Sequence, residues 1–174
     1  MTGAQALDLL MARFGNRAQT ALRANTRLEM VQFQSIMLEK GPVMPWFLQT
    51  NDASLTLTAN VQYVALPSDF LRELSDEYSL FILDDSSVKH SMTKKDWDEL
   101  LAWHGSAATS NLPLDYAIRN TRIYTGKTTT VARTLKFSYF NSDTAPADST
   151  ATNLWLTHAS DLIIAGTGEV VANK

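Results

Sequence analysis

The sequence predicts an α+β protein, in which a helical core (a long N-terminal helix, a short central helix and a C-terminal helix) carries a β-hairpin-rich extension. Apolar residues recur at helical spacing toward both ends of the chain, whereas between about residues 46 and 140 they alternate with polar residues, as in strands. The 174 residues, 45% of them hydrophobic, suffice for one domain with its own core. We therefore expect a single domain over residues 1–165 with β-rich insertions at about 46–92 and 115–140, followed by a C-terminal tail at 166–174.

Two helices are expected in the N-terminal part. Residues 4–14 place apolar side chains at helical spacing and are followed by Gly15, a typical helix end. A long helix is predicted over about residues 17–40, because Gly41-Pro42 terminates it. Its apolar residues form two nearly opposite arcs, so it lies in the middle of a bundle, or it packs in its own domain on one side and against a neighbouring subunit on the other. The first arc contains Leu22, Met30, Phe33, Ile36 and Met37, and the second contains Leu28, Val31 and Leu38.

Short strands are expected after Pro45, where the hydrophobic period changes to two. They are predicted around residues 46–48, 54–58, 61–65, 81–83, 88–92, 116–120, 122–124 and 135–140. A compact helix opens at Thr93 and ends at Gly105. After a polar loop over residues 141–152, an amphipathic helix begins near Asn153. The last residues, GTGEVVANK, contain two glycines, so we expect a frayed or extended tail.

Few residues suggest chemistry. The absence of cysteine excludes disulfides, iron–sulfur clusters and thiol catalysis. His90, His104 and His158 have no second ligand at metal-binding spacing. Residues 125–130, TGKTTT, contain the end of a phosphate-binding loop, but Thr121 stands where that motif needs glycine, so a hairpin turn is favoured. We expect no catalytic residue, no metal and no cofactor.

Carboxylates form several clusters that leave an enzymatic alternative open. Glycoside hydrolysis needs two carboxyl groups facing each other across a cleft, one of them with a raised pKa. Acidic runs beside loops are more often solvated surfaces, which is the interpretation we favour. The alternative is a peptidoglycan-cleaving activity built from these clusters, which replacing Glu73 and Glu99 in turn would test. The clusters are Asp69, Glu73, Asp76 and Glu77; Asp84 and Asp85; and Asp96, Asp98 and Glu99.

Charge and hydropathy also bear on partners. The net charge of −3 does not favour nucleic-acid binding by the whole surface. The first 28 residues are different, since they hold four arginines against the single acid Asp8, which predicts a solvated basic helix face or a contact with acidic protein or phosphate. No stretch approaches the roughly 20 apolar residues of a membrane span, and the N-terminus lacks the basic region of a secretory signal. We therefore expect a protein made and assembled in a cytoplasm.

Several short motifs follow one another in a distinctive order. They are Trp46-Phe47-Leu48, a threonine-rich strand pair, Tyr63-Val64-Ala65-Leu66-Pro67-Ser68-Asp69-Phe70-Leu71, the late strand at 135–139, an acidic loop, Thr152-Asn153-Leu154-Trp155-Leu156 and Ser160-Asp161-Leu162-Ile163-Ile164. Over about residues 16–170 this ordered set resembles the head-to-tail adaptor proteins of short-tailed phages, also called tail accessory factors. The closing helix of such proteins often carries a tyrosine soon after the Asp-Leu pair, whereas this chain has Ile163-Ile164-Ala165-Gly166 there.

The resemblance implies a virion structural protein. Such adaptors bind in twelve copies beneath the dodecameric portal after DNA packaging, extend the DNA channel, help retain the genome and provide the platform for the tail nozzle or needle. The implied partners are the portal protein, the nozzle or needle protein, neighbouring copies in a twelve-membered ring and, without sequence specificity, double-stranded DNA in the channel. The implied location is the portal vertex of the virion, after assembly in the host cytoplasm. The alternatives are the hydrolase above and a head-completion connector of a long-tailed phage.

The expected interface residues come from the long helix, the aromatic positions, the Leu-Pro turn and the tail, because aromatic side chains dominate binding hot spots. The expected portal or subunit interface consists of Leu22, Phe33, Met37, Trp46, Tyr63, Pro67, Phe70, Trp103, Gly166, Gly168, Val170 and Val171. The expected contacts with channel DNA or an acidic partner are Arg13, Arg17, Arg23 and Arg27.

Overall fold

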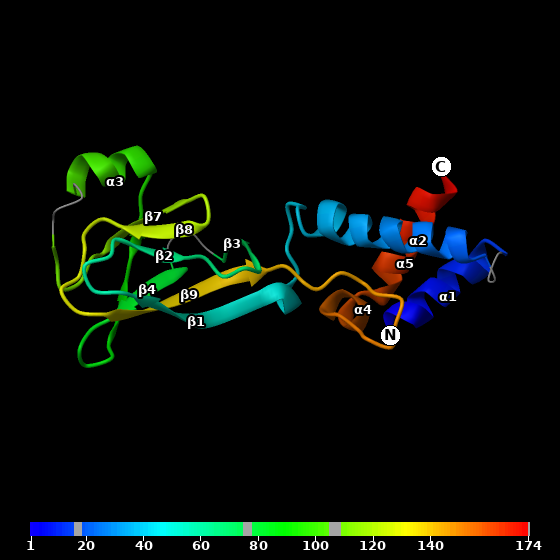
Figure 1. Cartoon of the computed structure of the whole chain (residues 1–174), viewed down its shortest axis with the longest axis horizontal. Coiled ribbons are helices and arrows are strands. Elements are labelled where there is room, and N and C mark those ends of the chain that lie inside the picture. The colour runs from blue at the N-terminus through cyan, green and yellow to red at the C-terminus, as the bar shows by residue number, and fades with distance from the viewer. Residues whose placement is uncertain (16–18, 75–77, 105–108, 174) are drawn as a thin grey trace. The chain divides into compact units, whose positions relative to one another are not determined.

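The chain forms two compact units in the computed structural model (Figure 1). We call residues 1–48 and 142–174 the helical unit, and residues 49–141 the sheet unit. The structure describes residues 1–15, 19–74, 78–104 and 109–173, apart from the side chains of Trp103 and His104. The expectation of one domain over residues 1–165 stays a prediction.

The helical unit is built from short helices with defined caps. They are α1 (Gly3–Arg13), α2 (Thr20–Gln32), a π-helix (Phe33–Leu38), a 3₁₀-helix (Trp46–Leu48), α4 (Leu154–His158) and α5 (Ser160–Ala172). Thr2 begins α1 with a capping box, in which its hydroxyl accepts from the Gln5 amide at 3.3 Å and the Gln5 side chain accepts from the Thr2 amide at 2.9 Å. Asn153 caps α4 by accepting from the Leu156 amide at 2.8 Å.

The predicted helical core with a long N-terminal helix is wrong. The α-helix ends at Gln32, and the described residues contain five short α-helices and two sheets. The next turn is a π-helix, in which residues five apart share a face. This geometry brings together Gln34 and Glu39, whose side chains form a 2.8 Å hydrogen bond inside the unit. The α-helix thus ends where a tertiary hydrogen bond forms, and the helix propensities of the residues cannot reveal such a bond.

The core of the helical unit lies where α1, α2 and α5 pack together (Figure 1). Its fully or almost fully buried apolar residues are Ala6, Leu7, Leu10, Met11, Met30, Trp155, Leu156, Ile163 and Ile164. Gly166 permits a close approach of α5 to the π-helix, since a Cβ there would lie 1.9 Å from Cζ of Phe33. The C-terminal residues, expected to be frayed or extended, are helical to Ala172. Packing of α5 on its neighbours thus outweighs the helix-destabilising effect of two glycines.

The sheet unit contains two sheets and one helix among its described residues. The strands are β1 (Gln49–Leu57), β2 (Tyr63–Ala65), β3 (Phe70–Glu73), β4 (Leu80–Leu83), β5 (Lys89–Ser91), β6 (Thr93–Lys94), β7 (Asp115–Arg119), β8 (Arg122–Thr125) and β9 (Arg133–Asn141), and the helix is α3 (Trp97–His104). The first sheet has the order β1-β9-β4-β5, with β3 also paired to β9, and the second has the order β2-β8-β7-β6. All pairs are antiparallel except β6 with β7. Residues 126–132 join β8 to β9, which belong to different sheets, so the hairpin turn predicted around Gly126-Lys127 is wrong.

Both sheets contribute to one core, which contains Leu57, Leu80, Ile82, Met92, Tyr116, Ile123, Leu135, Phe137 and Tyr139. The predicted alternation of Leu135, Phe137 and Tyr139 along the late strand is confirmed, because all three are buried. The Leu-Pro-Ser-Asp-Phe turn packs on this core, with the Phe70 ring stacked on Phe137 at 5.6 Å between ring centres. The Tyr139 hydroxyl donates to Asp69 at 3.0 Å. These contacts give the turn a structural role.

Substitution of Gly166 tests the close approach of α5. We expect Gly166→Ala to lower the free energy of unfolding by about 1–3 kcal/mol, because the new methyl group displaces the Phe33 ring. Gly168→Ala is the matched control: its nearest outside atom is Cδ2 of Leu10 at 3.7 Å, so we expect a gain of about 0.5–1 kcal/mol from helix propensity. Chemical denaturation measures both, and equal effects of the two substitutions would contradict the expectation.

Candidate interaction surfaces

Large apolar side chains are exposed on the helical unit. Leu28, Ile36, Met37, Val43 and Trp46 form what we call the exposed apolar set, with exposed fractions from 52% at Leu28 to 82% at Val43. Leu28 and Ile36 stand two helical turns apart on α2 and the π-helix, while Met30 of α2 is fully buried. The helix is therefore apolar on its packed side and on its solvent side. Exposed apolar groups of this size gather at protein interaction sites.

A groove lies between α2 and the C-terminal end of α5. It has a volume of about 360 Å³ and is lined by Leu22, Asn25, Thr26, Leu28, Glu29, Gln32 and Val171. Two expected interface residues, Leu22 and Val171, thus meet at one groove, and both are half-buried. Phe33 and Gly166 instead contact each other. One member of the exposed apolar set, Leu28, also lines the groove.

Trp46 belongs to an aromatic cluster of the helical unit. Its ring meets the edge of His158 at 5.2 Å and of Phe47 at 5.9 Å, measured between ring centres. Phe47 stacks on His158 at 5.1 Å and makes an edge contact with Trp155 at 5.1 Å. Trp46 remains 70% exposed. The cluster holds a large aromatic side chain at the surface, which is the arrangement of an interface anchor.

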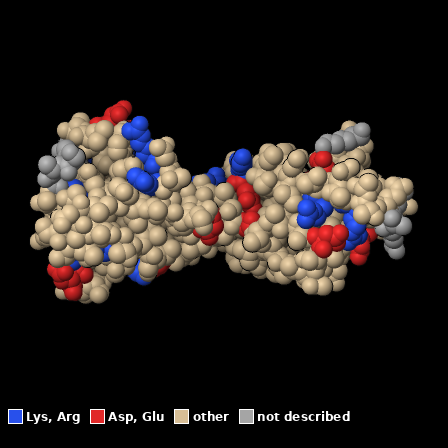
Figure 2. Space-filling model, viewed as in Figure 1, with Lys and Arg blue, Asp and Glu red and all other residues tan. Residues whose placement is uncertain are grey.

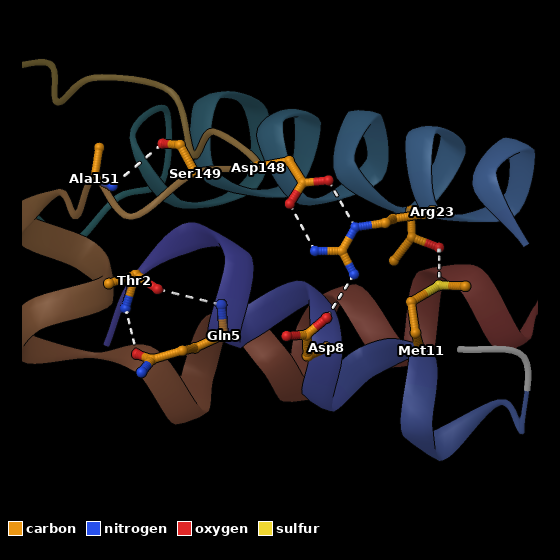
Figure 3. Close-up of polar contacts among 9 residues, drawn as sticks. Thr2, Gln5, Asp8, Met11, Arg23, Asp148, Ser149 and Ala151 are labelled. Carbon is orange, nitrogen blue, oxygen red and sulfur yellow. Dashed lines mark hydrogen bonds and ion pairs between the residues drawn. The ribbon is translucent and has the colours of Figure 1, made fainter. Parts of the chain in front are cut away.

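Arg23 has a structural role that the sequence did not reveal (Figure 3). Its guanidinium donates to both carboxylate oxygens of Asp148 and to Asp8, each at 2.6 Å. These hydrogen bonds lower the pKa of Asp148 below its ordinary value. Arg23 thereby ties α2 to α1 and to the loop before α4. Arg13 and Arg27 are exposed, and Arg17 lies outside the described residues.

The same loop lies directly on the start of α1. The amides of Gly3 and Ala4 donate to the carbonyls of Ala151 and Ser149, both at 3.0 Å. A Cβ at Gly3 would lie 1.8 Å from the Ala147 carbonyl oxygen, so only glycine fits there. The loop predicted over residues 141–152 is therefore a packed part of the helical unit.

A buried polar network holds both ends of this loop. One oxygen of Glu39 accepts from the Gln34 side chain at 2.8 Å, the Trp155 indole at 3.1 Å and the Asp143 amide at 3.3 Å. Gln34 accepts in turn from the Asn153 side chain at 2.8 Å. All of these side chains except that of Asp143 belong to buried residues. Hydrogen bonding of this kind is what makes burial of polar groups tolerable.

The carboxylates considered for hydrolysis are engaged in other contacts. Glu73 accepts from the Tyr116 hydroxyl at 2.5 Å and forms an ion pair with Lys94. Glu99 pairs with Lys95 at 2.9 Å. These contacts give both carboxylates a structural role. Asp76 and Glu77 lie outside the described residues.

The described histidines also make structural contacts. His90 lies 3.0 Å from Asp84, and this hydrogen bond lowers the pKa of Asp84. His158 belongs to the aromatic cluster, and the side chain of His104 is outside the described part of the chain. Within the described residues, no group of three or more acidic, histidine or cysteine side chains could hold a metal ion. In the same part of the chain, no helix combines the length and the apolar character needed to cross a bilayer.

The remaining expected interface residues are spread over both units. Tyr63 is 40% exposed on β2, and Pro67 and Phe70 are half-buried beside it in the chain. Gly168 and Val170 lie on α5. On the face drawn in Figure 2, charged side chains form small separate groups amid predominantly uncharged surface. The side chain of Trp103 is outside the described part of the structure.

The helical unit thus exposes large apolar and aromatic side chains. The family model described as "SU10 adaptor protein" matches residues 3–167. The chain therefore belongs to the SU10 adaptor family, a family of phage head-to-tail adaptors, and the resemblance stated from the motifs is confirmed. Membership implies a virion component at the junction of portal and tail and suggests a structural rather than an enzymatic role. No curated protein matches the chain.

The Arg23 cluster leads to a prediction about pH. We expect Asp148→Asn to lower the free energy of unfolding at pH 7 by about 1 kcal/mol or less, because the pair is partly exposed. The folded pKa of Asp148 lies below the ordinary 3.8, so its contribution is present above that pH and is lost as the pH falls through the folded value. The difference between wild type and variant therefore shrinks below about pH 4.

Denaturation in urea at a series of pH values measures this difference. Asp8→Asn is the control, because Asp8 accepts one hydrogen bond from Arg23 and its side chain is 68% exposed. We expect a smaller loss from this substitution. An equal loss at Asp8, or a difference that does not change with pH, would contradict the assignment.

Proposed function

We propose that this adaptor is a virion structural protein that binds the portal ring after DNA packaging. It extends the DNA channel and provides the platform to which the tail nozzle or needle protein attaches. The observation that carries this proposal is the exposed apolar set of the helical unit, since a subunit that functions in an assembly buries such groups against its neighbours. Family membership supports the adaptor role in general.

The proposed ring needs two unlike lateral surfaces on each subunit, because a head-to-tail contact joins different surfaces and closes by rotation. The solvent side of α2 and the π-helix, with Leu28, Ile36 and Met37, supplies one of them. Twelve copies arranged in this way match the dodecameric portal expected of short-tailed phages. The neighbouring copy then covers apolar surface that is exposed in the single chain.

The proposed portal contact uses the C-terminal end of α5 and the adjoining groove. Val170 and Val171 are half-buried there, and Val171 lines the groove with Leu22. Because α5 is helical to Ala172, docking uses a preformed helix end rather than a tail that becomes ordered on binding. A preformed element loses less conformational entropy on association than a disordered one.

Contact with the DNA of the channel is proposed for Arg13 and Arg27, which are exposed on the helical unit. Such contacts are made to phosphates, so they are independent of sequence and weaken with salt. Arg23 is not part of this proposal, since its guanidinium is bound to Asp148 and Asp8.

The proposal of portal binding is tested by mixing the purified adaptor with portal rings of the same phage. We expect Ile36→Asp/Met37→Asp to reduce loading of the ring at least tenfold, because two charges enter the proposed contact between copies. Both side chains are more than half exposed in the single chain, so we expect the fold to persist. Sedimentation and native mass measurement give the number of adaptor copies per portal.

The matched control is Val88→Asp, at an exposed apolar position of the sheet unit. We expect this variant to load like the wild type. Normal loading of the double variant would refute the proposed subunit contact, and failure of the wild-type protein to bind any portal ring would refute the portal proposal itself.

The DNA contact is tested with a short duplex at several salt concentrations. We expect Arg13→Gln/Arg27→Gln to reduce the slope of log affinity against log salt by about 2, one for each phosphate contact removed. Lys136→Gln, a substitution on β9 of the sheet unit, is the control for loss of a cation elsewhere. An unchanged slope in the double variant would rule out both arginines as DNA contacts.

A further inference from the structure

The outer face of the second sheet carries a row of arginine and aromatic side chains. Tyr63 of β2 lies opposite Tyr124 of β8, and Arg122 of β8 lies opposite Arg119 of β7. Opposed residues share a face and side chains alternate along each strand, so all four lie on one face. The intervening Ile123 points the other way and is buried in the core.

Ring contacts join these side chains to Trp97 of α3, and we call the five residues the arginine–aromatic face. The Arg122 guanidinium lies 4.1 Å from the centre of the Tyr63 ring, and that of Arg119 lies 4.7 Å from the Trp97 ring. The Tyr124 ring lies between the rings of these two pairs, with its centre 4.7 Å from that of Trp97 and 5.8 Å from that of Tyr63. Both arginines of the face are therefore held against an aromatic ring.

The two guanidinium groups are available to a ligand. Arg119 and Arg122 are exposed, and Tyr63 is 40% exposed. Among the described residues, no carboxylate forms an ion pair with either arginine. Arg23 and Arg133, by contrast, are both paired with aspartate. Each guanidinium offers five N–H donors in a planar fork, and a ring already restricts its position.

We propose that the arginine–aromatic face docks an acidic segment of a partner protein, whose carboxylates accept hydrogen bonds from Arg119 and Arg122. Planar guanidinium groups bind carboxylates through two parallel hydrogen bonds. Tryptophan, tyrosine and arginine are also the residue types that dominate protein binding hot spots. The charge of the face is complementary to an acidic segment, and its aromatic rings can contact apolar side chains within that segment. This proposal does not depend on the portal contact, because it concerns other elements of the chain.

The same face is less suited to nucleic acid. Single strands bind by stacking bases on open aromatic rings, whereas the rings of Tyr63 and Trp97 already contact an arginine and Tyr124. Duplex binding relies on many cations along the phosphates, whereas this face offers two, Arg119 and Arg122.

Selection from a random peptide display library on the full-length protein tests the proposal. Peptides retained by the wild type are counter-selected against Arg119→Gln/Arg122→Gln. We expect the remaining peptides to be enriched in aspartate and glutamate beside apolar residues. Their affinity should fall at least tenfold in the double glutamine variant and should remain unchanged in Lys40→Gln/Lys136→Gln, which removes the same charge at positions outside this face.

Two further measurements separate binding by these arginines from a change in fold. Arg119→Lys/Arg122→Lys keeps the charge but not the planar fork, so an intermediate loss of affinity supports the proposal. In the wild type, the side-chain Nε–H signals of the two arginines should shift in NMR spectra when a selected peptide is added. No enrichment of acidic residues, or equal binding by all variants, would overturn the proposal. Loss of duplex DNA binding in Arg119→Gln/Arg122→Gln, with no acidic peptide selected, would also overturn the proposal, because nucleic acid would then be the ligand of this face.

Discussion

The helical unit depends on one loop, residues 142–153, being held at both ends. The loop contains no regular secondary structure, so its backbone groups need partners from elsewhere in the molecule. The hydrogen bonds of Glu39 and Gln34 hold the segments that begin and end it, and Arg23 holds Asp148 between them. Gly3 lets its backbone lie against α1. The positions of α1, α2 and α4 relative to one another follow from these contacts.

Charged and apolar side chains differ in their contacts: several charged groups pair within the chain, whereas several large apolar groups remain exposed. Arg23, Lys94, Lys95 and Arg133 are paired with carboxylates of the same chain. Apolar side chains such as Met37 and Trp46 stay exposed. Apolar burial is non-directional and its free energy is proportional to area, which suits the proposed contacts between copies. On the sheet unit, Arg119 and Arg122 depart from this division, because rings rather than carboxylates hold them.

The sequence predicted features that depend on local periodicity. The alternation in β9 and a helix that begins next to Asn153 are both present. Prediction from the sequence failed where contacts between distant residues determine the structure. The π-helix accompanies hydrogen bonds between Gln34, Glu39 and the loop. Arg23 binds acids 15 and 125 positions away in the chain. The arginine–aromatic face was missed because strand register, not spacing alone, brings Tyr63 to Tyr124. Only the alternation of Arg119, Arg122 and Tyr124 around the turn at Asn120 hinted at it.

The division of the chain into two units has a consequence for biosynthesis. The sheet unit is one continuous segment, residues 49–141, whereas the helical unit combines segments from before and after it. During translation the strands can therefore pair while α1 and α2 still lack α5, the helix that completes their core. The apolar face of α2 stays unprotected throughout that interval, and a ribosome that stalls near the end of the message leaves a chain with a finished sheet unit and an aggregation-prone pair of helices.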